Sequence, residues 1–338
     1  MTMLRVGVVG TGIMGADHAR ILDRQTHGAT VAAVADVDRS RAQAVASGLA
    51  AAQVRDPDQL VASDDVDAVV VASADATHEQ FVLACLAAGK PVLCEKPLAP
   101  TSAASARLVE AELQGGEPLV SVGFMRRFDP GYEELKAAVD GGLVGDPLLV
   151  HCVHRNAAPT DVITPPAQIV TSSVVHEIDV ARWLLGEELA TVTVRPIRTA
   201  GAVPGRAPVL VTLETASGAV VDVEAYVHAG YGYDVRCEVV GTEGTAALDP
   251  RPPTVTWRAG QQASSVPADW RPRFADAYRR ELQDWVTAVV TKTRPAAATA
   301  WDGYLAALTC DAGVASAADG TVRAVEVPER PAFYAPRG

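Results

Sequence analysis

The sequence RVGVVGTGIMG at residues 5–15 decides the fold of the first part of the chain. Its β-branched residues predict a buried strand over Arg5–Val9, and the apolar spacing of Ile13–Asp23 predicts a helix. Three glycines at the spacing G-x-G-x-x-G separate the two elements. In this context Gly10 makes the tight turn, Gly12 lets the backbone approach a pyrophosphate, and the third glycine lets helix and strand pack closely. A glycine turn that binds no ligand is the alternative, which the flanking strand and helix disfavour.

Short apolar runs keep alternating with helical patterns up to residue 124. The expected elements are strand Thr30–Ala35, helix Ser40–Gly48, strand Ala68–Ala72, helix His78–Ala88, strand Pro91–Cys94, helix Ser102–Gln114 and strand Leu119–Val122. Thr77 is expected as an N-cap, and Gly89 as the left-handed residue at a helix C-terminus. This alternation predicts βαβ units and a doubly wound parallel sheet of the Rossmann type over residues 1–123.

The pattern changes over residues 124–338. One short helix is followed by a strand at Leu148–His154, a loop rich in proline and threonine, and a second helix. A run of strands comes next, and two helices close the chain: strands Val192–Ile197, Val209–Glu214, Val220–Val227, Val235–Val240 and Gly244–Leu248, then helices near Phe274–Thr291 and Thr299–Ala317. We expect an α/β domain with a mostly antiparallel open sheet that binds substrate and supports a homo-oligomer, a dimer or a tetramer.

Composition limits the functions that this chain can have. Its 338 residues suit two domains, since single cores stop growing above roughly 250 residues. A formal net charge of -12 disfavours nucleic acid and anionic lipid as partners, and no apolar run approaches the roughly 20 residues of a membrane span. The five cysteines are widely spaced and odd in number, and the N-terminal residues lack a secretory signal pattern. We therefore expect a cytoplasmic protein.

The residue that ends the second strand indicates which dinucleotide binds. Asp36 lies about 20 residues beyond the glycines, where a carboxylate accepts hydrogen bonds from the ribose hydroxyls of NAD. Arg39 is either a clamp for the 2′-phosphate of NADP or a solvated charge, and Asp36 would repel that phosphate. NAD is therefore expected first and NADP stays open. The expected cofactor contacts are Gly10, Thr11, Gly12, Ile13, Met14, Asp36, Arg39, Ser73, His78, Glu95 and Lys96.

Polar residues where the strands of such a sheet end are the first candidates for chemistry. Glu95-Lys96-Pro97 ends one predicted strand, and a lysine there can place its ammonium against an alkoxide at the carbon that exchanges hydride. A second candidate is His176, near the start of a predicted helix. Asp179 follows it on the same helix face, and two serines, at 172 and 173, precede it as expected N-caps. From these residues alone, a structural role for His176 is about as well supported as a catalytic one.

Seven short motifs spread along the chain resemble those of the Gfo/Idh/MocA oxidoreductases. They are Gly10–Gly15, Glu95–Pro97, Gly123–Asp129, His154–Asn156, His176–Asp179, Tyr231–Asp234 and Trp301–Tyr304. The likeness runs nearly end to end, and within the family it is strongest to the bacterial inositol 2-dehydrogenases. It implies a C-terminal α/β domain with an open sheet, commonly used for oligomerisation, and the oxidation of a ring carbinol to a ketone.

The resemblance also implies roles for particular residues. It makes Lys96 and His176 the catalytic pair, which meet at one carbon, with His176 as the acid/base on the reacting hydroxyl. Around the substrate it places Arg127, Asn156, Asp179 and Tyr233. These residues define the substrate pocket that we expect.

The sequence departs from the family at two places near this pocket. Ser172 stands where the family has a relay aspartate, and a serine cannot hold a negative charge opposite an imidazolium. The loop from 157 to 170, with Pro159, Pro165 and Pro166, also differs from the inositol enzymes. The cofactor is therefore better defined by the sequence than the substrate.

Three functions follow from these residues. The first is a reversible NAD-dependent dehydrogenase of inositol or a related polyhydroxylated ring. The second is a reductase of a ketone or aminocyclitol, and the third is a dinucleotide-binding regulator without turnover. We expect no metal, because His151 and His154 lie three residues apart on one strand and so face opposite sides of it.

Overall fold

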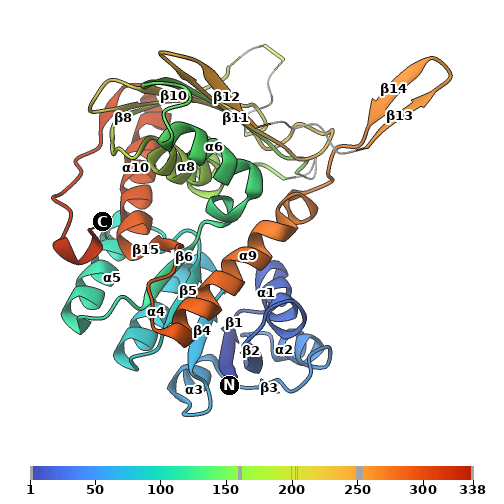
Figure 1. The fold of residues 1–338 in the computed structure, drawn as a ribbon, viewed down its shortest axis with the longest axis vertical. Coiled ribbons are helices and arrows are strands. Elements are labelled where there is room, and N and C mark those ends of the chain that lie inside the picture. The colour runs from blue at the N-terminus through green and yellow to red at the C-terminus, as the bar shows by residue number, and fades with distance from the viewer. Residues whose placement is uncertain are drawn as a thin grey trace. The chain divides into compact units, whose positions relative to one another are not determined.

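The computed structural model describes residues 3–158, 162–198, 200–201, 203, 205–248 and 254–335. The chain divides into two compact units (Figure 1), the first made of Met1–Phe128, Asp276–Ala307 and Glu329–Gly338, and the second of Asp129–Ala275 and Leu308–Pro328. A single boundary between residues 123 and 124 would assign residues 276–307 and 329–335 to the second domain, whereas in the structure they belong with the first unit.

The first unit is built on a sheet in the order β15-β6-β5-β4-β1-β2-β3. Its strands are β1 Leu4–Val9, β2 Ala29–Ala35, β3 Gln53–Val54, β4 Ala68–Val71, β5 Val92–Glu95, β6 Val120–Gly123 and β15 Ala298–Thr299. Strands β1 to β6 pair in parallel, and β15 pairs antiparallel with β6. The predicted doubly wound sheet is confirmed, and its strand order reverses between β1 and β4, where ligands bind in such folds.

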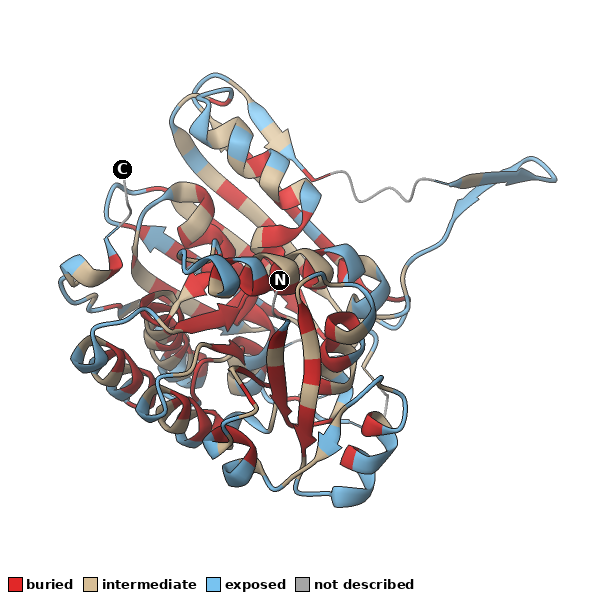
Figure 2. Cartoon of the chain, turned by 60° about the horizontal axis from the view of Figure 1, so that its bottom comes forward, coloured by how far each residue is buried: buried red, intermediate tan, exposed pale blue. Residues whose placement is uncertain are grey.

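Buried strands explain why this sheet was visible in the sequence. Every residue of β4, β5 and β6 is buried. Figure 2 shows strands that are mostly in the colour of buried residues, with some intermediate and exposed positions. A strand covered on both faces has a sequence that is an unbroken apolar run.

The helices of the first unit are α1 Ile13–Arg24, α2 Arg39–Ala46, α3 Pro57–Ala62, α4 His78–Ala87, α5 Ser102–Gly115 and the Asp276–Thr291 part of α9 Trp270–Thr291, with 3-10 turns η1 Asp75–Thr77, η2 Met125–Phe128 and η4 Ala332–Tyr334.

Two expected helix ends have different outcomes. Gly89 has φ +63°, so the expected left-handed residue after α4 is confirmed. Thr77 does precede α4, but its side chain makes no capping hydrogen bond. Its hydroxyl instead donates to the carbonyl of Ala74 at 2.7 Å and lies 2.7 Å from the hydroxyl of Ser73. The expected side-chain cap at Thr77 is therefore wrong.

The second unit contains a sheet in the order β12-β11-β7-β10-β9-β8-β16. Its strands are β7 Pro147–Arg155, β8 Leu189–Pro196, β9 Val209–Thr215, β10 Val220–Tyr226, β11 Asp234–Gly241, β12 Thr245–Ala247 and β16 Arg323–Ala324. Strands β7 and β10 run parallel, and the other neighbouring strands run antiparallel. This confirms the expected, mostly antiparallel sheet.

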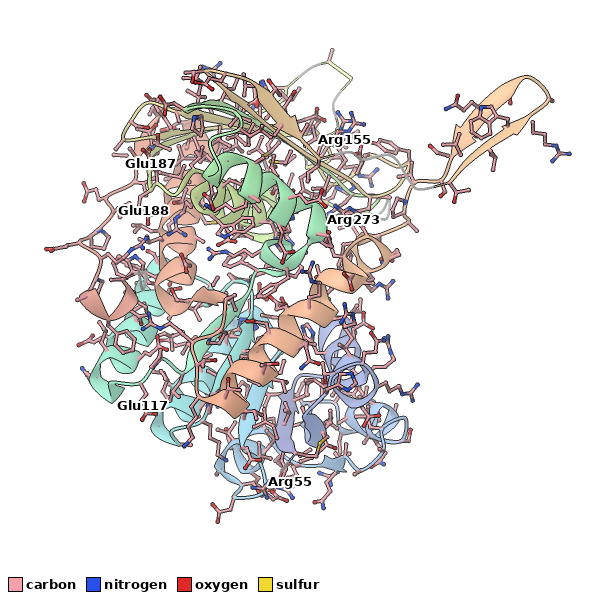
Figure 3. All side chains as sticks on the ribbon, in the orientation of Figure 1. Arg55, Glu117, Arg155, Glu187, Glu188 and Arg273 are labelled. Carbon is pink, nitrogen blue, oxygen red and sulfur yellow. The ribbon has the colours of Figure 1, made fainter. Side chains whose placement is uncertain are left out.

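Helices cover one face of this second sheet (Figure 1). They are α6 Pro130–Asp140, α7 Pro166–Ile169, the π-helical turn η3 Val170–Val174, α8 Val175–Leu185 and the Leu308–Asp319 part of α10 Ala300–Asp319. In β9, buried and exposed residues alternate along the strand, as expected for a sheet with one open face. Charged residues lie at both ends of the unit, with Arg155 and Arg273 at one end and Glu187 and Glu188 at the other (Figure 3).

A hairpin of β13 Val255–Arg258 and β14 Gln261–Ser264 pairs only with itself, and it is exposed along nearly its whole length (Figure 2). The indole of Trp257 on it is 74% exposed. In the described part of the chain, no helix combines the length and apolar character needed to span a membrane.

Candidate active site

The glycine turn after β1 has the geometry that its sequence predicts. Gly10 has φ +90°, and a Cβ there would lie 2.5 Å from the backbone of Ala72, so only glycine fits. A Cβ at Gly15 would lie 1.9 Å from the carbonyl oxygen of Gly10, because helix α1 packs closely on the turn. A Cβ at Gly12 would meet nothing within 4 Å. The backbone at Gly12 therefore faces open space, as a phosphate-binding position requires.

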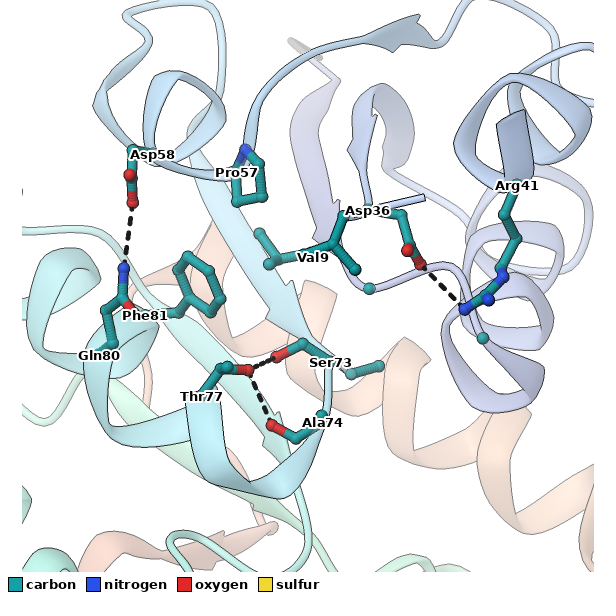
Figure 4. Close-up of a pocket in the computed structure, with 14 residues that line it drawn as sticks. Val9, Asp36, Arg41, Pro57, Asp58, Ser73, Ala74, Thr77, Gln80 and Phe81 are labelled. Carbon is teal, nitrogen blue, oxygen red and sulfur yellow. Dashed lines mark hydrogen bonds and ion pairs between the residues drawn. The ribbon is translucent and has the colours of Figure 1, made fainter. Parts of the chain in front are cut away.

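A pocket of about 510 Å³ opens where β1, β2 and β4 end (Figure 4). Gly10 follows β1, Asp36 follows β2 and Ser73 lies just beyond β4, and all three line it. This is the carboxyl edge of the sheet at the reversal of strand order, which is where a dinucleotide binds in a Rossmann fold. Apolar walls are contributed by Val9, Val37, Pro57 and Phe81.

Asp36 is held as a carboxylate in this pocket. Its Oδ2 accepts from the backbone N–H and the hydroxyl of Thr11 at 2.7 and 2.9 Å, and its Oδ1 accepts from the N–H of Asp38 at 2.9 Å. Partial burial works to raise the pKa of Asp36, but these donors and the charge of Arg41 outweigh it, so the pKa lies below its ordinary value. The negative charge favours ribose hydroxyls over a 2′-phosphate.

Arg41, rather than the expected Arg39, is the arginine of this pocket. A guanidinium nitrogen of Arg41 lies 3.7 Å from the Asp36 carboxylate (Figure 4), whereas Arg39 lies 3.7 Å from Asp56. The cap decides which arginine points inward, because Asp38 accepts from the N–H groups of residues 40 and 41 and so fixes the first turn of α2. The sequence showed both arginines but not this turn.

The other expected cofactor contacts lie around the same edge. Ile13 is 59% exposed at the start of α1, followed by the half-buried Met14. His78 is buried, with Nδ1 at 2.7 Å from the carbonyl of Pro97 and Nε2 at 3.2 Å from that of Ser73. Both carbonyls can only accept, so a ring N–H of His78 is the donor in each such hydrogen bond. His78 thus ties the segment after β4 to the segment after β5.

Glu95 and Lys96 lie where β5 ends, and the Lys96–Pro97 peptide is cis. The Glu95 carboxylate accepts from Nε2 of His18 at 2.7 Å and from the backbone N–H of Lys96 at 3.2 Å. Burial works to raise the pKa of Glu95, but the His18 hydrogen bond and the Lys96 ammonium outweigh it, so its pKa lies below the usual value. A charged carboxylate is therefore fixed at the base of Lys96 by His18, a residue of α1 that the sequence did not reveal.

Arg127 belongs to the turn η2, directly after β6 and Phe124. Its guanidinium lies 3.4 Å from Oδ1 of Asp302, whose other oxygen accepts from the N–H and the hydroxyl of Thr299 at 2.9 Å. Asp302 thereby fixes the direction of the expected substrate-binding arginine.

In the second unit, helix α8 carries His176 and Asp179, and both side chains are buried. The helix is not amphipathic in the usual way, because Val175 to Arg182 are all buried, charged residues included. The ring of His154, from β7, lies with its centroid 6.3 Å from that of His176. Tyr233 packs edge-on against His154 at 5.8 Å between ring centroids. The structure thus brings three of the polar residues in the quoted motifs together.

Asn156 follows β7, two residues beyond His154. Its backbone N–H donates to Tyr226 and its carbonyl accepts from Ala229, which anchors the main chain there. In the loop that follows Asn156, Pro165 and Pro166 open the short helix α7, and Pro159 lies outside the described residues.

Ser172 and its neighbour Ser173 are not N-caps. They lie inside the π-helical turn η3, which runs directly into α8, and no side chain caps either element. The exposed hydroxyl of Ser172 donates to the carbonyl of Gln168 at 2.6 Å. The expectation was wrong because the helix begins earlier, at α7, so the serines are interior residues that bond back to the preceding turn.

His151 and His154 have separate partners, as strand alternation predicts. Nδ1 of the part-exposed His151 lies 2.7 Å from Asp222, and Nδ1 of the buried His154 lies 3.0 and 3.1 Å from the oxygens of Glu177. Among the described residues, no group of three or more His, Cys, Asp or Glu side chains is arranged to hold a metal ion.

Comparisons with known proteins match nearly the whole chain. The description "Oxidoreductase family, NAD-binding Rossmann fold" fits residues 4–124, and "Oxidoreductase family, C-terminal alpha/beta domain" fits residues 136–327. Inositol 2-dehydrogenase 2 of Saccharopolyspora erythraea is 52% identical over 99% of each chain. Inositol 2-dehydrogenase of Agrobacterium fabrum is 45% identical over 98% of this chain and 99% of its own.

A solved structure has the same fold. Myo-inositol dehydrogenase of Lactobacillus casei, in complex with NAD(H) and myo-inositol, superposes with a TM-score of 0.93 at 35% identity, covering 99% of this chain and 100% of its own. The family resemblance that the motifs carried is thereby confirmed at full length. The chain belongs to the Gfo/Idh/MocA oxidoreductase family.

Proposed function

We propose that this chain is an NAD-dependent dehydrogenase that oxidises a ring carbinol of inositol, or of a related cyclitol or sugar, to the ketone. The observation that carries the proposal is full-length similarity to enzymes named inositol 2-dehydrogenase, together with Lys96 and His176 in the matching motifs. The similarity to the Lactobacillus casei enzyme with NAD(H) and myo-inositol supports the same chemistry.

The residues around the glycine turn fit NAD. Gly10 and Gly12 leave the backbone open to a pyrophosphate, and Asp36 is a carboxylate on the wall of the pocket that follows. Bound there, NAD supplies the hydride acceptor of the reaction. The charge of Asp36 opposes a 2′-phosphate, which supports NAD over NADP.

Lys96 and His176 are the proposed catalytic residues. The ammonium of Lys96 stabilises the negative charge that develops on the substrate oxygen, and His176 accepts the hydroxyl proton. Arg127, Asn156, Ser172, Asp179 and Tyr233 are proposed to surround the substrate. Asp179 and Tyr233 are buried and carry hydrogen-bonding groups, which suits recognition of the hydroxyl groups of a substrate.

The open face of the second sheet supports a homo-oligomer, a dimer or a tetramer. Leu210 is 40% exposed on that face, and Leu149 and Val153 are part-exposed on β7. These exposed apolar side chains alternate with charged ones such as Asp222 and Glu224 on the same face, and a second copy of the chain could cover them by symmetry. All five cysteines are free and buried, which supports a reducing compartment such as the cytoplasm.

The test is a substrate panel. The protein is incubated with NAD and a set of cyclitols and sugars while NADH absorbance is followed, and NAD binding is measured in parallel by fluorescence. Turnover of inositol or a close relative is the expected result. Silence across the panel with NAD bound would contradict the proposal, and reduction of ketones or aminocyclitol precursors by NADH or NADPH alone would favour the reductase reading.

A further inference from the structure

The second unit contains a buried histidine–carboxylate pair to which no role has yet been given. His154 on β7 and Glu177 on α8 have side chains that are 3% and 1% exposed. Nδ1 of His154 lies 3.0 and 3.1 Å from the two carboxylate oxygens of Glu177. Removing both groups from water is costly, so such a pair persists when it has a specific role or is well satisfied.

The carboxylate of Glu177 determines which nitrogen of the His154 ring carries the proton. A carboxylate can only accept, so the proton of a neutral His154 lies on Nδ1 and points at Glu177. This tautomer makes Nε2 the acceptor nitrogen of the ring. Glu177 also stabilises the imidazolium that forms when Nε2 takes a proton, which is the role of the carboxylate in a histidine–carboxylate catalytic pair.

His154 is next to His176. The ring centroids are 6.3 Å apart, close enough for the ring edges to be joined directly or through one water molecule. Tyr233 packs edge-on against His154, and Phe274 packs edge-on against Tyr233, so aromatic rings limit the access of bulk water. Ser172 cannot replace His154 as the proton acceptor, because a serine hydroxyl is not a base and cannot carry the negative charge of a carboxylate.

We propose that His154, held by Glu177, is the internal proton acceptor for His176. The inference rests on the proposed function. The substrate O–H bond breaks and its proton bonds to a ring nitrogen of His176. That N–H bond then breaks as a new N–H bond forms at Nε2 of His154, so the positive charge moves to the ring that faces Glu177. The proton is released to solvent after the ketone leaves.

The decisive variant is His154→Asn. Its amide nitrogen lies near the position of Nδ1 and keeps a donor for Glu177, but nothing replaces Nε2. Turnover should fall about 100-fold with little change in the KM for the cyclitol, a loss typical of a missing acid/base group. The matched control is His151→Asn on the same strand. His151 pairs with the part-exposed Asp222, and the H151N variant should have wild-type turnover. Wild-type turnover in H154N would overturn the proposal, since a purely structural role needs only the Glu177 bond.

A second variant covers the case in which H154N does not fold. Glu177→Gln keeps the size of the side chain and removes the charge opposite the imidazolium, so turnover should again fall by at least tenfold with KM nearly unchanged. Unchanged turnover in E177Q would count against the relay.

The tautomer gives a readout that needs no activity. In NMR spectra of ¹⁵N-histidine-labelled protein at a pH near 8, the signals lost in H154N should belong to a ring protonated on Nδ1 alone. Any other protonation pattern would overturn the proposal. If the wild type oxidises no cyclitol, the proposed function fails, and this measurement still decides whether His154 is set up to accept a proton.

Discussion

Each unit contains a buried histidine–carboxylate pair beside a proposed catalytic residue, and the two pairs are arranged in opposite ways. In the first unit the carboxylate of Glu95 contacts the catalytic position, through the N–H of Lys96, and His18 supports it from behind. In the second unit the ring of His154 lies beside His176, and Glu177 supports it. A fixed negative charge suits the positioning of an ammonium, whereas a supported imidazole suits the acceptance of a proton.

The largest expected effect comes from removing the ammonium that the first pair positions. Lys96→Met keeps the length and apolar stem of the side chain but has no charge to stabilise the substrate oxygen. Turnover should fall about 10³-fold, while the dissociation constant for NAD, measured by fluorescence titration, stays nearly the same. Wild-type turnover in K96M would show that Lys96 has no catalytic role. The pair of His18 and Glu95 would then have no catalytic ammonium to position.

A smaller but still large effect is expected from breaking the first pair itself. His18→Leu leaves the buried Glu95 carboxylate without the side-chain donor of His18, and the free energy of unfolding at neutral pH should fall by about 3 kcal/mol in urea titrations. The double variant with Glu95→Leu carries no buried charge and should regain most of that loss. A double variant as unstable as H18L would show that packing, not charge, explains the loss.

The pH dependence of this variant follows from the shift at Glu95. Its folded pKa is lowered, so its contribution to stability is present above the ordinary value of 4.5 and is lost as the pH falls through the folded pKa. In H18L that contribution is gone, and the buried carboxylate becomes a cost that protonation relieves. The difference in stability between wild type and H18L should therefore begin to shrink above pH 4.5, where burial raises the pKa of Glu95 in H18L, and should keep shrinking as the pH falls through the lowered pKa of Glu95 in the wild type. A difference that does not change with pH would exclude this account.

These pairs also show what the sequence could not predict. His18 and Glu95 are 77 residues apart, and His154 and Glu177 are 23 apart on different elements, so no local pattern links either pair. The strands of the first unit were predicted because burial on both faces makes them continuous apolar runs. Elements with little apolar content, such as the exposed hairpin β13–β14 and the two-residue β3, gave no such signal.

The site residues also separate into those that local sequence predicts and those that depend on the fold around them. The positions of Gly10, Gly12 and Asp36 at the edge of the pocket follow from backbone geometry and strand ends, which the sequence shows. Arg41 was missed in favour of Arg39, since the direction of a side chain in a first helical turn depends on its cap. The serine caps before His176 were wrong because a π-helical turn extends the helix toward its N-terminus, which residue preferences do not reveal.

An intermediate effect is expected on the preference for NAD over NADP, and it tests which arginine lies beside the ribose. Asp36→Ser removes the charge that repels a 2′-phosphate, and the ratio of kcat/KM for NADP to that for NAD should rise about tenfold. In that background Arg41→Ala should abolish the gain, while Arg39→Ala, the matched control, should keep it. If Arg39→Ala, and not Arg41→Ala, abolishes the gain, then Arg39 is the arginine that contacts the 2′-phosphate, as the sequence first suggested.

The smallest effect is expected at Ser172, where the second unit has a hydroxyl turned toward Gln168. Ser172→Asp places a carboxylate one helical turn before His176, where its negative charge stabilises a His176 imidazolium. In the wild-type background the gain in inositol oxidation near neutral pH should be a few-fold at most, because His154, supported by Glu177, already accepts the proton. In H154N the same substitution should raise turnover about tenfold, since no internal acceptor competes. Equal gains in both backgrounds would mean that the two positions act independently, and the second pair would then be a structural feature of the helix rather than a path for the proton.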